Sequence, residues 1–228
     1  MTLPAGVEHG DRHAFLARAS TLGARTVEPN IAHPLPASPW DRDEFVPITY
    51  TTVDPKALAD SYEQMATSVL LDVRRFDRIV PDDALRVLIE SEEIRSAVVS
   101  KMAGAQRLGE RLLEFGVEVF DYSPERAVQA DLGITEPRFA IAATGSLVQD
   151  SSLEGGRGAS LIPRIHLALV PEHRIVVDTA AVFAHFRTEP MPANVVLISA
   201  PSRTGDIEMI LTVGVHGPIK VIVALLSS

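Results

Sequence analysis

Cysteine is missing from this chain of 228 residues, so disulfides and an iron–sulfur cluster held by its own thiolates are both excluded. A zinc ion would have to rely on histidine and carboxylate ligands alone. Five of the seven histidines show no metal-ligand spacing, namely His9, His13, His33, His173 and His185. We therefore expect a chain with no cofactor of its own, neither a metal ion nor a flavin, haem or iron–sulfur centre.

Long apolar runs and basic runs are missing as well. No stretch approaches the ~18–20 apolar residues of a membrane-spanning helix. The segment Met1–Leu16 is interrupted by Pro4, Gly6, Glu8 and Asp11, so it lacks the apolar core of a signal peptide. The net charge is −9 without a run of Lys or Arg, which argues against binding to nucleic acid or to an anionic membrane. We expect a cytoplasmic protein.

Familiar catalytic fingerprints are also lacking. The sequence contains no Walker P-loop, no GxGxxG fingerprint and no nucleophile elbow of a Ser-His-Asp enzyme. The composition, with 46% hydrophobic and 22% charged residues, is typical of a globular protein. The function must therefore be sought in polar residues that the fold brings together.

Prolines divide the chain into two parts. A short helix is predicted over His9–Ser20, and five prolines then follow between residues 29 and 47, which predicts an extended arm. We expect the arm, with Trp40 and Phe45, to lie against its own domain or against a neighbouring subunit, which would make a homo-oligomer. The predicted organisation is an N-terminal helix and proline-rich arm over 1–53, and an α/β domain over 54–228.

Apolar spacing predicts alternating helices and strands from Asp54 onward. The predicted helices are one that starts at Asp54-Pro55 and continues through Val73, and those over Pro81–Glu93, Gly104–Phe115, Asp178–Phe186 and Thr204–Val213. The predicted strands are Val117–Phe120, Phe139–Ala143, Ile165–Val170, Arg174–Val177, Asn194–Ser199 and Lys220–Leu226. This alternation favours a three-layer α/β fold with a largely parallel sheet. We expect Phe139–Ala143 and Asn194–Ser199 among its central strands.

The first candidate site is the turn Thr144-Gly145-Ser146, which follows the predicted strand Phe139–Ala143. Such a turn exposes backbone N–H groups and two hydroxyl groups at the carboxyl edge of a sheet, where open α/β folds bind ligands. Alternatively, the glycine serves only to reverse the chain.

The second candidate site lies where a strand breaks at Pro201 and a predicted helix begins near Thr204. Thr204 can cap the free N–H groups of this helix, and Asp206 in its first turn complements the helix dipole. Ser202 and Arg203 precede the helix, so that Arg203 can hold a carboxylate or phosphate at its N-terminus. Alternatively, Arg203 pairs with Asp206 and the segment is a plain helix cap.

Three further residues lie in glycine-rich or strand-edge positions. His216 lies in the tight loop Gly214–Pro218 with little steric cover, so it is available for proton transfer or ligand contact; alternatively, it hydrogen-bonds the neighbouring turn. Arg157 lies in the segment Glu154–Gly158 and can fold over a ligand as a clamp. His166 begins an apolar strand and is either a ligand contact or a core or edge histidine.

Taken together, these segments resemble the lactate-utilisation protein C family (LutC/YkgG), whose domain is called the LUD domain. The matching residues are Leu132-Gly133-Ile134-Thr135, Phe139-Ala140-Ile141-Ala142, Thr144-Gly145-Ser146, Arg157, Ser160, Pro163, His166, Pro201-Ser202-Arg203-Thr204, Asp206-Ile207-Glu208 and Gly214-Val215-His216-Gly217-Pro218. The run PSRT-x-DIE followed by GVHGP is specific, and the match covers the second half of the chain best. The family usually has an acidic residue before the Thr/Ser-Gly turn, where this sequence has Ala143, so we expect no carboxylate role there.

The resemblance implies a Rossmann-like, three-layer α/β fold similar to the NagB/RpiA/CoA-transferase group. It also implies a role in oxidising L-lactate to pyruvate beside two partner proteins, one of which carries iron–sulfur clusters. A chain without cysteine fits a non-redox subunit that binds a small carboxylate or a partner protein through loops at strand ends. One alternative is a stand-alone transferase or isomerase on a phosphorylated or CoA-linked substrate, and another is a purely structural assembly protein. The family supplies no settled catalytic residue to carry over.

Overall fold

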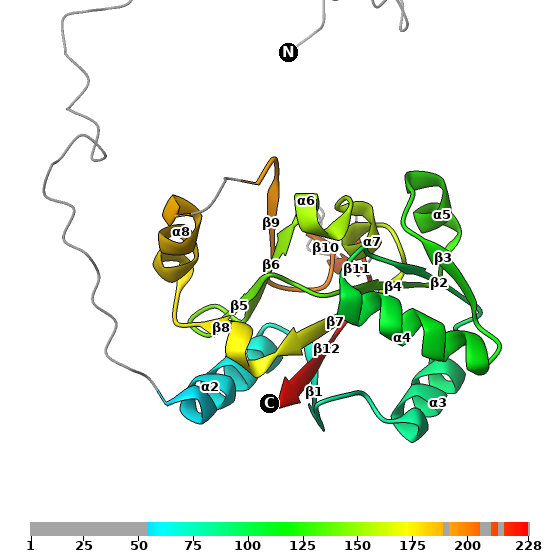
Figure 1. Ribbon diagram of the computed structural model, residues 1–228, viewed down its shortest axis with the longest axis horizontal. Helices are drawn as coiled ribbons and strands as arrows, with labels where there is room; N and C mark the ends of the chain where they lie inside the picture. Colours follow the sequence, from blue (N-terminus) through cyan, green and yellow to red (C-terminus); the bar gives the residue numbers. More distant parts are fainter. Residues whose placement is uncertain (1–53, 189–191, 206–210, 214–216, 228) are drawn as a thin grey trace, which may run out of the picture. The chain divides into compact units, whose positions relative to one another are not determined.

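A six-stranded parallel sheet forms the centre of the structure. The computed structural model of the chain describes residues 54–188, 192–205, 211–213 and 217–227. The main sheet has the strand order β1-β12-β7-β4-β2-β3 (Figure 1). In that order its strands are Asp72–Asp77, Lys220–Ser227, Ile165–Pro171, Leu132–Thr135, Ser96–Val99 and Glu118–Asp121. The helix and the proline-rich arm predicted within 1–53 lie outside the described residues.

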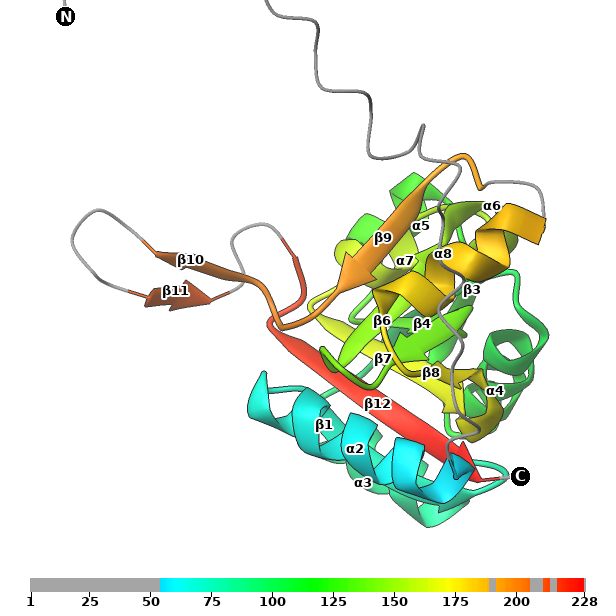
Figure 2. The ribbon, with the colours of Figure 1, turned by 90° about the vertical axis from the view of Figure 1, so that its left-hand side faces the viewer.

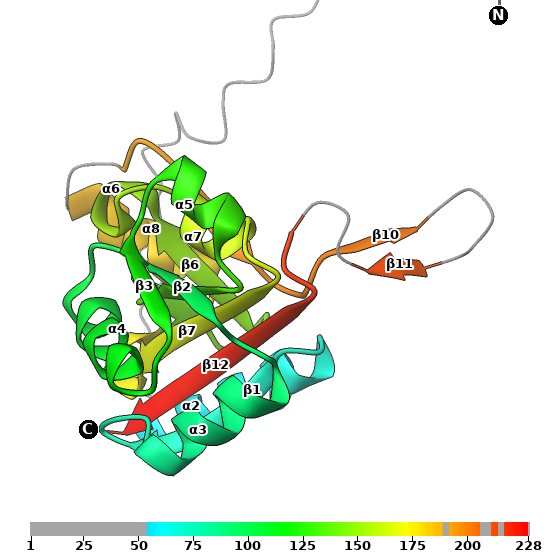
Figure 3. The ribbon, with the colours of Figure 1, turned by 90° about the vertical axis from the view of Figure 1, so that its right-hand side faces the viewer.

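Both faces of the main sheet are covered, which makes three layers. The helices are α2 (Pro55–Ser68), α3 (Asp82–Ser91), α4 (Ala103–Glu114), α5 (Pro124–Gln129), α6 (Ser151–Glu154), α7 (Gly158–Leu161), the 3₁₀ helix η1 (Glu172–Arg174) and α8 (Thr179–Thr188). In β7, Leu167 and Leu169 pack with α3 and α4, whereas Ala168 and Val170 pack with α2 and a second sheet. Figure 3 shows the ribbon from the side on which α3 and α4 lie. Because successive side chains of a strand point to opposite faces, an uninterrupted apolar run is buried on both.

The second sheet has four strands in the order β8-β5-β6-β9. These strands are Ile175–Val176, Phe139–Ile141, Ser146–Asp150 and Val195–Ile198. The prediction that Phe139–Ala143 and Asn194–Ser199 are central strands of the core sheet is therefore wrong, because both segments belong to this smaller sheet. Its pairings are mixed: β6 runs antiparallel to β5 and β9, whereas β5 and β8 are parallel.

Signals at the helix ends explain why the predicted helices form. The Asp54 carboxylate accepts a hydrogen bond from the Lys56 N–H at 3.3 Å, and Pro55 takes the first helical position of α2. This helix ends at Ser68, and Val73, which the periodicity assigned to the helix, belongs to β1. Gly116, with φ of 80°, follows the last turn of α4, as expected for a helix C-terminus.

The described ends of the segment that was predicted to form a helix over Thr204–Val213 are strands instead. β10 (Arg203–Gly205) and β11 (Leu211–Val213) pair in antiparallel register, and the hairpin stands away from the two sheets (Figure 2). Five of the ten residues in this segment are β-branched: Thr204, Ile207, Ile210, Thr212 and Val213. These side chains favour extended backbone, which outweighs the capping signals at the start of the segment.

The predicted fold class is confirmed: an α/β fold with a parallel sheet between two covering layers. Within the described ranges, every helix is too short or too polar to cross a membrane. The parallel arrangement gives the main sheet two different edges, one at the amino ends of its strands and one at the carboxyl ends.

Candidate functional site

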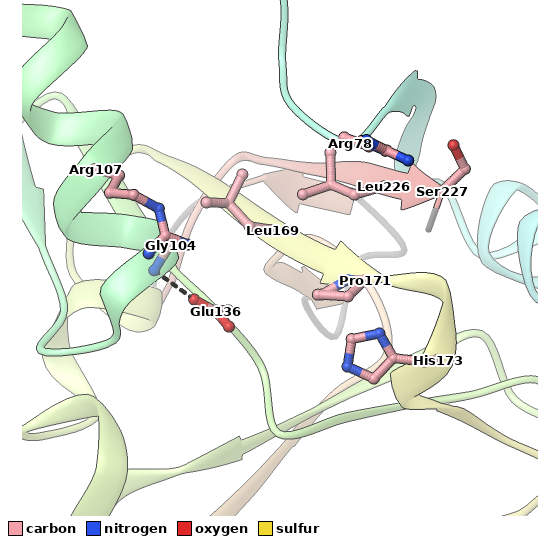
Figure 4. A pocket seen from close by; sticks show the side chains of 9 residues that line it. All are labelled: Arg78, Gly104, Arg107, Glu136, Leu169, Pro171, His173, Leu226 and Ser227. Atoms are coloured by element: carbon pink, nitrogen blue, oxygen red, sulfur yellow. Dashed lines mark hydrogen bonds between the residues drawn. The ribbon is translucent and has the colours of Figure 1, made fainter.

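A pocket of about 340 Å³ lies at the carboxyl edge of the main sheet (Figure 4). It is lined by Arg78, Gly104, Arg107, Glu136, Leu169, Pro171, His173, Leu226 and Ser227. Most of these residues end a parallel strand or follow one closely, and Gly104 and Arg107 come from the first turns of α4. The carboxyl edge is where open α/β folds bind ligands, so the pocket is the candidate site.

Glu136 is the acidic residue of the pocket and is held by two contacts. It directly follows β4, and its side chain is 11% exposed. The Gly104 N–H, at the start of α4, donates to its Oε2 at 2.6 Å, and the Arg174 guanidinium pairs with its Oε1 at 2.7 Å. A Cβ atom on Gly104 would lie 2.3 Å from that same Oε2, so a side chain at this position would displace the Glu136 carboxylate. The carboxylate thus satisfies the N-terminus of α4.

Arg78 and Arg107 bring positive charge to the same pocket. Both residues are exposed, and neither forms an ion pair with another residue in the described part of the chain. The charge of Glu136 is already matched by Arg174. The pocket therefore carries excess positive charge from two guanidinium groups, which are suited to hold a carboxylate or phosphate by paired hydrogen bonds.

Glu154 lies behind Glu136 and is almost completely buried. Its Oε1 accepts a hydrogen bond from the Glu136 backbone N–H at 3.2 Å, and its Oε2 has no partner among the described residues. Burial raises the pKa of Glu154 to about 7, since water cannot solvate the charged form. The site therefore pairs a carboxylate that faces the pocket with a carboxyl group that can change its protonation near neutral pH.

The turn Thr144-Gly145-Ser146 joins β5 and β6 and is closely packed. Gly145 has φ of 66°, and a Cβ atom there would lie 2.5 Å from the backbone N of Ala66 in α2. The Thr144 and Ser146 hydroxyls hydrogen-bond each other at 2.8 Å, and Ser146 bonds Ser199 at 2.7 Å. The glycine therefore reverses the chain against a helix, and the hydroxyl groups are partnered within the protein.

The second sequence motif precedes the amino end of β12. The Ser202 N–H donates to the Pro218 carbonyl at 2.8 Å, and Arg203 and Thr204 belong to β10. The expected position of Arg203 at a helix N-terminus is wrong, because Arg203–Gly205 is a strand. Asp206 and His216, two further candidate site residues, lie outside the described residues.

His166 is a core histidine and Arg157 is a surface residue. His166 is 0% exposed, and its Nε2 lies 2.8 Å from the Thr135 hydroxyl, which also accepts a hydrogen bond from the Gln149 side chain at 2.7 Å. Burial lowers the pKa of His166 to about 3, so the ring is neutral at physiological pH. Its Nδ1 finds no partner among the described residues. Arg157 is exposed and directly precedes α7.

Opposite edges of the main sheet thus separate some of the sequence-predicted residues from the pocket. Ser202, Gly217 and His166 lie at the amino ends of β12 and β7, whereas Glu136 and Ser227 lie at carboxyl ends. An eight-residue strand such as β12 spans about 25 Å, so one small ligand cannot contact both edges. Sequence reasoning missed the residues that line the pocket. Predicting β1 and β4 as strands would have revealed Arg78 and Glu136, which directly follow them.

Fold and pocket together define a class: an α/β protein with a Rossmann-like parallel sheet and a pocket at its carboxyl edge. The model of the LUD domain matches residues 117–226. A lactate utilization protein C of Exiguobacterium is 32% identical over 183 residues, which cover 72% of this chain and 75% of that protein. The one from Halalkalibacterium halodurans is 31% identical, covering 72% and 76%. The chain belongs to the lactate utilization protein C family.

A solved structure supports the fold. The crystal structure of a DUF162 family protein from Deinococcus radiodurans superposes with a TM-score of 0.55 at 22% identity, covering 76% of this chain and 99% of that one. At this level of identity the likeness concerns the fold alone.

Proposed function

We propose that the chain is a non-redox subunit of a system that oxidises L-lactate to pyruvate, and that it binds a small carboxylate at the carboxyl edge of its main sheet. The observation that carries the proposal is the presence of two guanidinium groups, those of Arg78 and Arg107, in a pocket whose acidic residue is already paired. Two relatives that share 31–32% identity with the chain are named lactate utilization protein C, which points to the same substrate.

A partner must take the electrons in this proposal. Oxidation of lactate to pyruvate releases two electrons, and a chain without cysteine cannot hold an iron–sulfur cluster through its own thiolates. We therefore propose that an iron–sulfur-containing partner subunit receives the electrons, while this chain binds and orients the carboxylate.

Calorimetric titration with L-lactate tests the binding step. Wild type is compared with Arg78→Ala and Arg107→Ala, and with Arg95→Ala as a matched control, because Arg95 is exposed and precedes β2 at the opposite edge of the sheet. Loss of one charge-assisted contact should weaken binding roughly ten- to hundred-fold. The proposal fails if both pocket variants bind like wild type, or if Arg95→Ala weakens binding equally.

A second candidate function is transfer or isomerisation of a phosphorylated or CoA-linked substrate. Glu154 favours it, because a carboxyl group with a pKa of about 7 is suited to general acid–base catalysis. The size of the pocket favours a small carboxylate instead, since about 340 Å³ is near the lower end of ligand sites. Thermal shift with CoA and with sugar phosphates, beside lactate, distinguishes the two functions.

A further inference from the structure

Glu136 faces the pocket as an acceptor with unused capacity. An ionised carboxylate has two lone pairs on each oxygen and no hydrogen to donate. The Gly104 N–H takes one position on Oε2, and Arg174 takes one on Oε1, so each oxygen can accept a further hydrogen bond. Figure 4 shows the Glu136 side chain lining the pocket together with Arg78, Arg107 and His173. A ligand that carries a hydrogen-bond donor can therefore bind to Glu136.

The pocket thus combines two different demands on a ligand. The anionic end of the ligand is attracted by Arg78 and Arg107 and repelled by Glu136. We infer that Glu136 makes this pocket selective for a 2-hydroxy carboxylate over the corresponding 2-oxo carboxylate, an inference that rests on the proposed function. Glu136 accepts a hydrogen bond from the hydroxyl group of the ligand, while the two arginines hold its carboxylate. Glu136 is thus a residue that determines specificity in the pocket.

The chemical difference between the two ligands is small but well placed. A hydroxyl group at C2 can donate a hydrogen bond to the Glu136 carboxylate. A keto oxygen at C2 can only accept, so it would face the Glu136 carboxylate, which also only accepts. A site built to bind a hydroxyl group rejects the analogue without it, because its own polar group is then left unpaired. The pocket is open to water, so we expect a preference of about tenfold.

Rigidity of Glu136 supports this selectivity. Its backbone N–H is held by Glu154 and its carboxylate by Gly104 and Arg174, so the acceptor is fixed before a ligand arrives. A fixed acceptor cannot turn away from the wrong ligand, and little ordering is required on binding.

Wild-type protein alone provides the decisive test. Affinities are measured by calorimetry for L-lactate, pyruvate and propionate, which carry at C2 a hydroxyl group, a keto group and no oxygen. The expected order is L-lactate, then propionate, then pyruvate, with lactate about tenfold tighter than pyruvate. If all three bind equally and still require Arg107, the inference is wrong and the proposed function stands. If none of the three binds, both are overturned.

A substitution that changes the acceptor into a donor gives a second test. Glu136→Gln keeps the size of the side chain but offers an amide N–H to a keto oxygen, so the lactate-to-pyruvate preference should fall at least tenfold. Glu172→Gln is the matched control, since Glu172 precedes the pocket residue His173 but does not line the pocket. An unchanged ratio in Glu136→Gln overturns the inference. If that variant does not fold, the wild-type ratio still decides.

Discussion

Two buried side chains, His166 and Glu154, have pKa values that are displaced in opposite directions. Burial lowers the pKa of His166 from 6.5 to about 3. Below about pH 6.5 the unfolded chain therefore takes up a proton that the folded chain does not, and the free energy of unfolding falls as the pH falls. Burial raises the pKa of Glu154 from 4.5 to about 7. Between these pH values the folded chain keeps a proton that the unfolded chain releases, and the free energy of unfolding falls as the pH rises. Between pH 4.5 and 6.5 the two effects nearly cancel.

Removing either group should therefore reveal the effect of the other. In His166→Gln the free energy of unfolding should fall as the pH rises from 4.5 to 7, and in Glu154→Gln it should fall as the pH drops from 6.5 to 4.5, each by about 1 kcal/mol per pH unit. Urea denaturation at several pH values measures both slopes. Asp72, whose pKa is lowered by its hydrogen bond with Arg74, titrates below this window. Slopes of the same sign in the two variants would contradict the assignment.

Arg78 has a left-handed backbone conformation, with φ of 57°, directly after β1. An L-residue other than glycine pays about 1 kcal/mol for this conformation. Arg78→Gly should therefore be more stable than Arg78→Ala by about 1 kcal/mol, although both lose the guanidinium group. Arg107 provides the control: it lies within α4, where glycine is worse than alanine by a similar amount, so Arg107→Gly should be less stable than Arg107→Ala.

Thermal denaturation of the four variants decides this prediction. If the alanine variant is more stable than the glycine variant at position 78 as well as at position 107, Arg78 is not strained. The strain is stored at a residue that lines the pocket, which agrees with the general tendency of such conformations to cluster at functional sites.

At the scale of elements, the contact between β4 and α7 depends on Gly133. A Cβ atom there would lie 1.8 Å from the Ala159 carbonyl oxygen and 3.1 Å from Pro163, so the helix would have to move away from the strand. Gly133→Ala should reduce the free energy of unfolding by about 3 kcal/mol. Gly116→Ala should cost only about 1–2 kcal/mol, because φ of 80° is unfavourable for alanine but open space surrounds the position. Urea denaturation compares the two, and an equal cost would contradict the close packing of α7.

Local signals predicted four of the helices and six of the strands that the structure describes, and competition between signals explains part of what they missed. Capping by Asp54 and the apolar spacing of residues 81–93 and 104–115 correctly predicted α2, α3 and α4. Thr204 offered a helix-capping signal, but Arg203–Gly205 pairs with Leu211–Val213 as two strands. The prediction missed this because pairing between two strands is not visible in a local window of sequence. For the same reason the sequence could not tell that Phe139–Ala143 pairs in a second sheet and not in the main one.

At the scale of the whole molecule, Ser202 and His166 lie at the edge of the main sheet opposite the pocket, and Thr144 lies in a turn of the second sheet. Motif residues such as Thr144 and Ser202 were grouped because each follows or precedes a strand, and strand ends were expected to meet at one site. Which edge a strand end occupies depends on strand order and direction, and these follow from long-range pairing. The residues of the pocket, by contrast, carry no motif: Arg107 lies on a helix surface, and Arg78 and Glu136 follow strands that local patterns did not reveal.

The most direct test is to locate the binding site. NMR titration of the ¹⁵N-labelled chain with L-lactate reports which residues the ligand contacts. We expect amide shift changes at the carboxyl edge, at Gly104, Arg107 and Glu136, with little change at the amino edge. Changes concentrated at Gly145, Ser146 and Ser202 instead would place the ligand at the sequence motifs and would contradict the account.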